Sequence, residues 1–389
     1  MTEAQTNRVT RLGELARLFL KLGATAFGGP AAHVALMEEE VVRRRGWLTH
    51  AEFLDLLGAT NLIPGPNSTE LAMYVGQRRA GWPGLLVAGI GFILPATVIV
   101  AVLAWAYVRF GQLPEVEGLL YGVKPVIIAV VVQALWGLGR TAIKSKWLAG
   151  VGLAGAVACF LGVNELIVLF AAGLGLGAGR ALRRQQGALA CLAPLLANGV
   201  GWPLAAAVAA PPASLSALFW FFLKVGSVLF GSGYVLLAFL RADLVERWHW
   251  LTDGQLLDAI AVGQFTPGQL FTTATLIGYL LGGPSGAVIA TAGIFLPAFV
   301  FAALSGPLLP RLRASPVAGA FLDGVNVASL ALMAVVTFRL GAAALVDWPA
   351  ILLAGASAVL LLRYRVNSAW LVLGGAVAGL SLSALARFP

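Results

Sequence analysis

Charged residues are scarce in this chain of 389 residues. Asp, Glu, Lys and Arg together make up 11% of it, whereas soluble domains carry about 25%. Hydrophobic residues make up 59%, and no long polar segment interrupts them. This composition excludes a globular enzyme with a single membrane anchor. It predicts a multi-pass membrane protein whose function resides in its membrane-embedded part.

Cysteine and histidine are also rare. The two cysteines, Cys159 and Cys191, lie in apolar stretches without metal-site spacing, and nothing in their context favours a disulfide. The three histidines do not cluster in the sequence. No glycine-rich phosphate-binding loop followed by Lys-Ser/Thr is present, so ATP-driven transport by this chain is not expected. We therefore expect no cofactor, no metal and no enzymatic reaction.

The net charge of +9 has a membrane explanation. Lys and Arg collect in the cytoplasmic loops of membrane proteins, and part of such an excess can attract anions. The expected partners are accordingly the lipid bilayer and a small anion, with no nucleic acid and with a possible second copy of the chain.

The sequence contains an internal duplication. Between residues 19 and 69, 17 of 51 positions are identical to the residue 203 positions later, including Trp47-Leu48-Thr49 and Pro64-Gly65. After a slip of one residue the match resumes at an offset of 202. We predict a polar tail at 1–11, a first repeat at 12–184, a linker with one transmembrane helix at 185–214, and a second repeat at 215–389. Such duplication is typical of transporters with a site between two repeats.

Each repeat contains two apolar regions that are interrupted. Glycines interrupt residues 12–45 and 215–245, and a Pro-Gly pair interrupts residues 52–80 and 255–282. Proline removes a helical hydrogen bond and glycine permits tight reversals. The pieces are about 12–16 residues long, too short to cross a bilayer alone. We predict re-entrant hairpins or broken helices, covered by protein or lining a cavity. If each region instead spans once, the helix count changes and the duplication remains.

The distribution of basic residues predicts the orientation of the repeats. In the first half nearly all Lys and Arg fall on one face, which is therefore cytoplasmic, and the loop at 109–117 lies on the other face. In the second half the equivalent loops carry the opposite bias. We expect an all-α fold in which the second repeat is inverted about an axis in the membrane plane.

Two lysines lie within the repeated apolar stretches at equivalent positions, Lys21 and Lys224. A lysine deep in a bilayer is costly and usually faces a cavity, so a pair of cations around a central anion is one interpretation. The alternative is that each ammonium group reaches its own interface.

The ends of the half-helices are the second candidate for an anion site. A helix N-terminus that points into a cavity offers N–H groups and the positive end of a dipole. The alternative role of these residues is simple capping of interrupted helices. The predicted substrate-binding residues are Lys21, Lys224, Gly28, Gly29, Asn61, Pro64, Gly65, Asn67, Ser68, Thr69, Gly231, Gly233, Gln264, Pro267, Gly268 and Thr272.

Three acidic residues are candidates for proton coupling. Asp55 and Asp258 occupy equivalent positions, whereas Glu70 has Thr273 as its partner and is unique to the first half. A carboxyl group in a low-dielectric cavity favours its protonated form and can carry a proton. For Asp55 and Asp258 the alternative is a first-turn acid that stabilises its helix dipole. Glu70 is the stronger candidate.

The ordered motifs of both halves resemble the chromate ion transporter family, in its long two-domain form. They are Phe-Gly-Gly-Pro at 27–30, Trp-Leu-Thr at 47–49, Asn-Leu-Ile-Pro-Gly-Pro at 61–66, Leu-Pro-Ala at 94–96 and Gly-Val-Lys-Pro at 122–125, with degenerate copies in the second half. The resemblance implies export of chromate across the bacterial inner membrane, linked to the membrane energy gradient, with isosteric sulfate as the competitor.

The functional expectation is a secondary transporter that works by alternating access between the two repeats. A second interpretation is a sulfate or general oxyanion carrier that moves chromate by mimicry. A third is a scaffold or lipid-handling protein whose duplicated glycines serve only packing.

Overall fold

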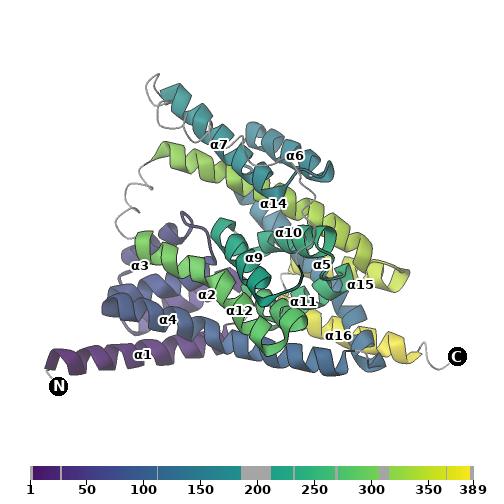
Figure 1. The fold of residues 1–389 in the computed structure, drawn as a ribbon, viewed down its shortest axis with the longest axis horizontal. Helices are drawn as coiled ribbons and strands as arrows, with labels where there is room; N and C mark the ends of the chain where they lie inside the picture. The colour runs from purple at the N-terminus through teal and green to yellow at the C-terminus, as the bar shows by residue number, and fades with distance from the viewer. Residues whose placement is uncertain are drawn as a thin grey trace.

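The computed structural model describes residues 3–26, 29–111, 113–184, 212–230, 233–267, 270–305, 315–364 and 366–385. Every regular element in these ranges is helical. The helices form one body, with the N-terminus and the C-terminus at opposite ends of its long dimension (Figure 1).

The two halves have the same order of elements. The first consists of α1 (Glu3–Thr25), α2 (Gly29–Glu38) continued by the π-helical η1 (Glu39–Arg44), α3 (His50–Thr60), α4 (Asn67–Phe110), α5 (Pro114–Ala142), α6 (Lys146–Phe160) and α7 (Glu165–Arg184). The second consists of α9 (Leu215–Val228), η4 (Gly233–Val235), α10 (Leu236–Phe239), η5 (Leu240–Arg247), α11 (Asp253–Phe265), η6 (Leu270–Thr272), α12 (Thr273–Ser305), α14 (Pro316–Ala344), α15 (Trp348–Tyr364) and α16 (Ser368–Leu385).

The helices are interrupted where the sequence predicts. α1 ends before the first glycine motif and α3 ends before the first Pro-Gly motif, and the second half repeats both interruptions. The duplicated Trp-Leu-Thr motif starts a helix in each half, because Thr49 and Thr252 are the N-caps of α3 and α11. Each forms a reciprocal capping box, with Glu52 and Gln255 respectively.

α4 and α12 are helical hairpins rather than single rods. Their helical geometry breaks at Gly81 and Gly283, which have φ of 67° and 62°. The limbs then pack so closely that a Cβ on Gly76 would overlap the carbonyl oxygen of Gly84. In α12 the hydroxyls of Thr275 and Thr291 bridge the two limbs at 2.7 Å. Each hairpin therefore joins a short first limb, which starts at the Pro-Gly turn, to a long second limb.

The long limbs of α4 and α12 run antiparallel against each other. The ring of Phe299 contacts Gly89 in the middle of both limbs. Ser305, at the end of α12, forms a 2.6 Å hydrogen bond with Tyr74, close to the turn of the α4 hairpin. Leu280, close to the turn of α12, lines the same cavity as Val108 at the end of α4. The long limb of α4 and the long limb of α12 thus point in opposite directions.

The C-terminal helices of each half pack on the other half. α5 packs against α15 and α16, while its counterpart α14 packs against α6 and α7 (Figure 1). Reciprocal polar contacts join these elements: Tyr121 donates to Asp347 at 2.6 Å, and Lys144 pairs with Asp323 at 2.7 Å. Contacts that repeat with the roles of the halves exchanged are those of a two-fold arrangement.

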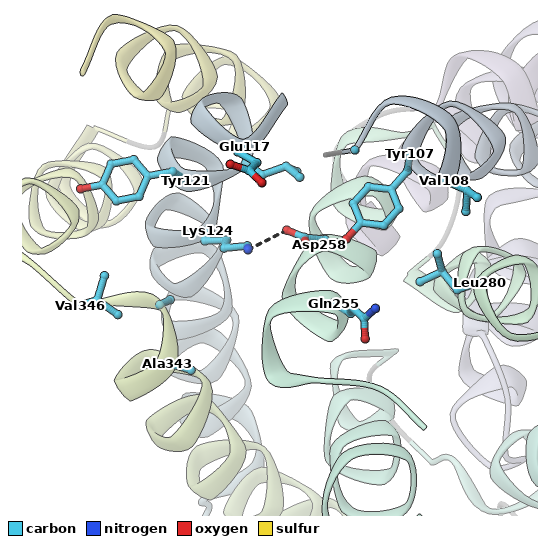
Figure 2. A pocket seen from close by; sticks show the side chains of 13 residues that line it. Tyr107, Val108, Glu117, Tyr121, Lys124, Gln255, Asp258, Leu280, Ala343 and Val346 are labelled. Atoms are coloured by element: carbon cyan, nitrogen blue, oxygen red, sulfur yellow. Dashed lines mark hydrogen bonds and ion pairs between the residues drawn. The ribbon is translucent and has the colours of Figure 1, made fainter. Parts of the chain in front are cut away.

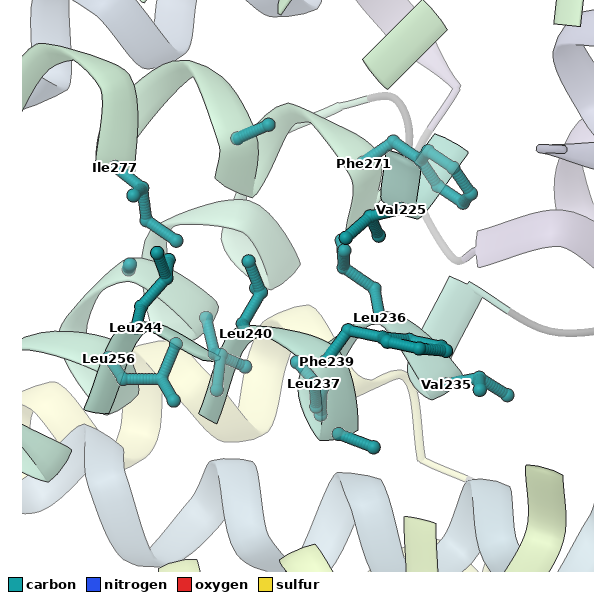
Figure 3. Packing of buried hydrophobic residues seen from close by; sticks show 14 of the residues in the cluster. Val225, Val235, Leu236, Leu237, Phe239, Leu240, Leu244, Leu256, Phe271 and Ile277 are labelled. Carbon is teal, nitrogen blue, oxygen red and sulfur yellow. The ribbon is translucent and has the colours of Figure 1, made fainter. Parts of the chain in front are cut away.

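The largest apolar cluster lies where the interrupted helices of the second half meet. Leu236, Leu240, Leu256, Phe271 and Ile277 are at most 1% exposed and come from successive elements between α10 and α12 (Figure 3). The same cluster continues into α4, α5 and α7 of the first half. Burial of apolar area therefore holds the short, interrupted elements in place and joins the halves.

The outer surface of the described helices suits a bilayer. Six of them are long and apolar enough to span one: those at Asn67–Phe110, Pro114–Ala142, Glu165–Leu182, Leu270–Ser305, Pro316–Ala344 and Ser368–Leu385. Trp147 and Trp348, at the starts of α6 and α15, are 74% and 75% exposed, as expected of aromatic residues at the membrane interface. The chain is thus a multi-pass membrane protein. The further span expected at 188–210 lies outside the described residues.

Close packing within the hairpins makes a first prediction. Gly76→Ala should destabilise the protein by about 1–3 kcal/mol, since the added methyl group forces the two limbs apart. The measurement is the apparent Tm of the detergent-purified protein. Gly137→Ala in α5 is the control, because its Cβ would meet nothing within 4 Å. Equal Tm values for the two variants would contradict the packing described.

Candidate functional site

The helix interruptions of the two halves lie beside one another. The backbone N–H of Gly65, in the first Pro-Gly turn, donates a 2.8 Å hydrogen bond to the carbonyl oxygen of Leu229, at the glycine break of the second half. His33 joins the two interruptions of the first half, since its ring nitrogens lie 3.3 Å from Ser68 Oγ and 3.1 Å from the carbonyl oxygen of Ala26. In the second half Gly233 packs against Phe271.

The first Pro-Gly turn is buried between the halves. Pro64, Gly65 and Pro66 are all buried, and Ala298 of the long limb of α12 lies against Gly65. Gly65 has a φ of 143°, a region that favours glycine. α4 begins immediately afterwards, and no side chain caps its first turn. The positive end of this helix therefore lies at the buried turn.

The second Pro-Gly turn has a related but unequal structure. Pro267 is buried, and a short 3₁₀ turn that ends at the buried Thr272 precedes α12. Gln264 Oε1 accepts a 3.4 Å hydrogen bond from Tyr234. The two turns thus differ in the hydrogen-bonding groups beside them.

Unsatisfied polar groups concentrate at these two turns. Among the described residues, nine buried side-chain nitrogen and oxygen atoms have no hydrogen-bond partner. Five of the nine belong to Asn67 and Glu70 beside the first turn and to Gln264 and Thr273 beside the second. Buried polar groups normally have partners, so this concentration indicates a place for a polar ligand or for water.

Glu70 is the most unusual of these residues. It is 0% exposed, neither carboxyl oxygen has a partner, and the carboxyl group lies against Gly65. Burial of an isolated ionised carboxylate costs on the order of several kcal/mol. The partner of Glu70 in the second half is Thr273, so the interior acid belongs to one half alone.

Each of the two repeated lysines is paired with an acid of its own half. Lys21 Nζ lies 3.1 Å from Glu40 Oε1, and Lys224 pairs with Asp243 at the equivalent position. Glu40 also forms ion pairs with Arg44 and Arg45. The side chain of Lys21 is 60% exposed. The ammonium groups are thus engaged by carboxylates, and the prediction that they hold a central anion stays a prediction.

The two equivalent aspartates lie in different surroundings. Asp55 is exposed, whereas Asp258 is 5% exposed. Both lie beyond the first turn of their helices, where the acidic residues are Glu52 and Asp253, so a first-turn role for them is wrong. Asp258 pairs with Lys124 at 3.0 Å and accepts a 2.9 Å hydrogen bond from Tyr107. These three residues line a cavity of about 610 Å³ between the halves (Figure 2).

The structure brings together only part of the predicted set. The members that line or flank the buried turns are Pro64, Gly65, Asn67, Ser68, Thr69, Glu70, Gly233, Gln264, Pro267 and Thr272. Asn61 is exposed, but its side-chain oxygen accepts a 2.9 Å hydrogen bond from Asn67. Gly29 begins α2, while Gly28, Gly231 and Gly268 lie outside the described residues.

Sequence reasoning missed three residues: His33, Lys124 and Tyr107. His33 is 1% exposed. The sequence signal that could have identified it is a single histidine in an apolar stretch, shortly after the Phe-Gly-Gly-Pro motif. Lys124 lies near the start of a long apolar helix, where a lysine ammonium group can reach the membrane interface. The structure pairs it instead with an aspartate of the other half.

These features define a class of protein. It is an all-helical, multi-pass membrane protein of two related halves, with interrupted helices that meet in its interior, which is the architecture of transporters rather than of enzymes. The family model described as "Chromate transporter" matches residues 13–178 and again residues 216–380. The chain belongs to the chromate transporter family.

Full-length relatives carry the corresponding names. The chain is 34% identical over 389 residues to the "Chromate transport protein" of Cupriavidus metallidurans, which covers 97% of this chain and 94% of the relative. It is 32% identical to the "Probable chromate transport protein" of Synechococcus elongatus, over 88% of each chain. It is 34% identical to the "Chromate transport protein" of Pseudomonas aeruginosa, over 83% of this chain and 79% of the relative. No solved structure matches the chain.

The first Pro-Gly turn makes a second prediction. In Gly65→Ala the new methyl group would overlap the carboxyl group of Glu70, so transport should be lost even in protein that remains folded. Gly162→Ala is the control: its φ is 83° but nothing lies within 4 Å. Both variants carry backbone strain of about 1–3 kcal/mol. Comparable Tm values with transport lost only in Gly65→Ala are expected, and full transport by Gly65→Ala would contradict the site.

Proposed function

We propose that this protein is a secondary active transporter that exports chromate, a small tetrahedral dianion, across the bacterial inner membrane and that the export is coupled to the proton gradient. The observation that carries the proposal is that unsatisfied buried polar side chains concentrate at the two Pro-Gly turns, beside a helix N-terminus that no side chain caps. The names of the full-length relatives supply the anion.

The anion is proposed to bind between the two turns. Backbone N–H groups at the start of α4 suit an oxyanion, and the amide nitrogen of Gln264 and the hydroxyl of Thr273 add donors. Gly29 and Gly233, which begin the elements after the glycine breaks, would permit close approach of the backbone. Lys21 and Lys224 supply positive potential near these breaks rather than direct ligands, because each is engaged by a carboxylate of its own half.

Glu70 is proposed to carry the proton. An ionised Glu70 would repel a dianion bound at the neighbouring turn, whereas a protonated Glu70 would not. Loading of the anion and of the proton are therefore linked by charge. Asp258, which is buried at the interface of the halves, and Asp55 are the further candidates on the proton path.

The two-fold arrangement supports alternating access. The long limbs of α4 and α12 are antiparallel, which is what repeats of inverted topology produce. The short elements before each Pro-Gly turn are half-helices that fit a re-entrant path. Rocking of these half-helices against the intertwined α5–α7 and α14–α16 would expose the turns to one side of the membrane at a time.

Chromate uptake into everted membrane vesicles tests the function. Wild-type vesicles should accumulate chromate when a proton gradient is present and should lose this uptake when the gradient is collapsed. Uptake only into right-side-out vesicles would reverse the direction proposed. Accumulation of sulfate without chromate would indicate a sulfate carrier that moves chromate only by mimicry. Transport of neither anion would favour the scaffold interpretation.

Substitution of Glu70 tests the coupling separately. Glu70→Gln should reduce gradient-driven uptake to the level seen without a gradient, while exchange of internal for external chromate continues, because exchange moves no net proton. Glu39→Gln is the control, since it removes a carboxylate that pairs only at the surface. Gradient-driven uptake by Glu70→Gln at the wild-type rate would contradict the proton role.

A further inference from the structure

The cavity of about 610 Å³ lies on one face of the protein, between the halves. The end of α4 and the start of α5 contribute its first wall, and α11, α12 and the end of α14 contribute the second. On the charge-based topology this face is the non-cytoplasmic one, because it carries the acidic loop that follows α4.

One ion pair joins the two walls. Lys124 on α5 and Asp258 on α11 point toward each other across the cavity, with Nζ and Oδ1 3.0 Å apart (Figure 2). Tyr107 on α4 donates to the other carboxylate oxygen of Asp258 at 2.9 Å. The side chain of Lys124 is 25% exposed and that of Asp258 is 7% exposed. A partly buried pair of this kind holds its two helices together more firmly than a surface pair.

The ion pair is connected to the Pro-Gly turns through α11. Asp258 lies seven residues before Phe265, the last residue of α11, which is about 10 Å along a helix. α11 therefore reaches from the cavity to the second turn. A helix that is held at Asp258 cannot shift at its other end without breaking the ion pair.

The charges that line the cavity favour passage of a dianion through it over retention of the dianion. The ionised side chains are those of Lys124, Asp258 and Glu117, so the lining carries one excess negative charge. A dianion would find a cation only by displacing Asp258 from Lys124, and the carboxylates would then repel it outward. This is the electrostatics of a release path.

The positions equivalent to Lys124 and Asp258 do not repeat the Lys–Asp combination. The counterpart of Asp258 is Asp55, and the counterpart of Lys124 is Asn326, which carries no charge. Of these two equivalent positions, only the one in the first half carries a positive charge. The gating chemistry of the two faces is therefore unequal.

We propose that this cavity is the release vestibule of the transporter and that the Lys124–Asp258 ion pair, held by Tyr107, is its gate, which a tetrahedral dianion opens by taking the Lys124 ammonium from Asp258. The inference rests on the proposed function and extends it by assigning a second, transient anion contact. The gate keeps the path closed between transport events.

The test uses Lys124→Gln, Asp258→Asn and the charge exchange K124D/D258K in everted vesicles. Each single variant should lower gradient-driven chromate uptake about tenfold or more, and should speed the leak of preloaded chromate. The charge exchange should restore a slow leak, because it rebuilds the ion pair. Lys144→Gln is the matched control: it also breaks an ion pair between the halves, but one whose lysine is 62% exposed.

The outcomes separate the gate from the proposed function. Wild-type vesicles that carry no chromate would refute the function itself. Wild-type uptake with single variants that behave like Lys144→Gln would refute only the gate. Tyr107→Phe serves if the charge variants fail to reach the membrane: it removes one hydrogen bond to Asp258 and should raise the leak by a smaller factor. A wild-type leak in Tyr107→Phe would then overturn the proposal.

Discussion

Interrupted backbone inside a membrane protein must be covered, because its N–H and C=O groups cannot hydrogen-bond to lipid. This constraint organises the structure. The first Pro-Gly turn is buried against α12 and bonds through Gly65 to Leu229 of the other half. The first Pro-Gly turn and the glycine break of the second half consequently depend on the association of the halves. The same cover that stabilises them creates an interior, polar space in a chain that is otherwise apolar.

The intertwined halves combine symmetry with local differences. Reciprocal contacts such as Tyr121–Asp347 and Lys144–Asp323 repeat across the interface, and both Trp-Leu-Thr motifs cap a half-helix. The differences concern charged residues of the interior. When the repeats are aligned, Thr273 occupies the position of Glu70, and Asn326 occupies the position of Lys124. The charged residues therefore distinguish two halves whose framework is otherwise alike.

The repeats, the long apolar helices and the positions of the interruptions were predictable from the sequence, since glycine, proline and the offset of about 203 mark them directly. The intertwining of α5 with α15 and α16 was not, because periodicity shows that a helix face is apolar but not which partner covers it. Nor were the partners of the lysines. Glu40 and Asp243 lie 19 residues after Lys21 and Lys224, so only the path of the chain through the glycine breaks brings each pair together.

The central claim is that a dianion binds where the two Pro-Gly turns meet. A structure determined by electron cryo-microscopy with chromate bound tests it most directly. If the dianion binds there, the map should show tetrahedral density between residues 64–69 and 264–273, next to the start of α4. Density held between Lys21 and Lys224 and remote from both turns would contradict it.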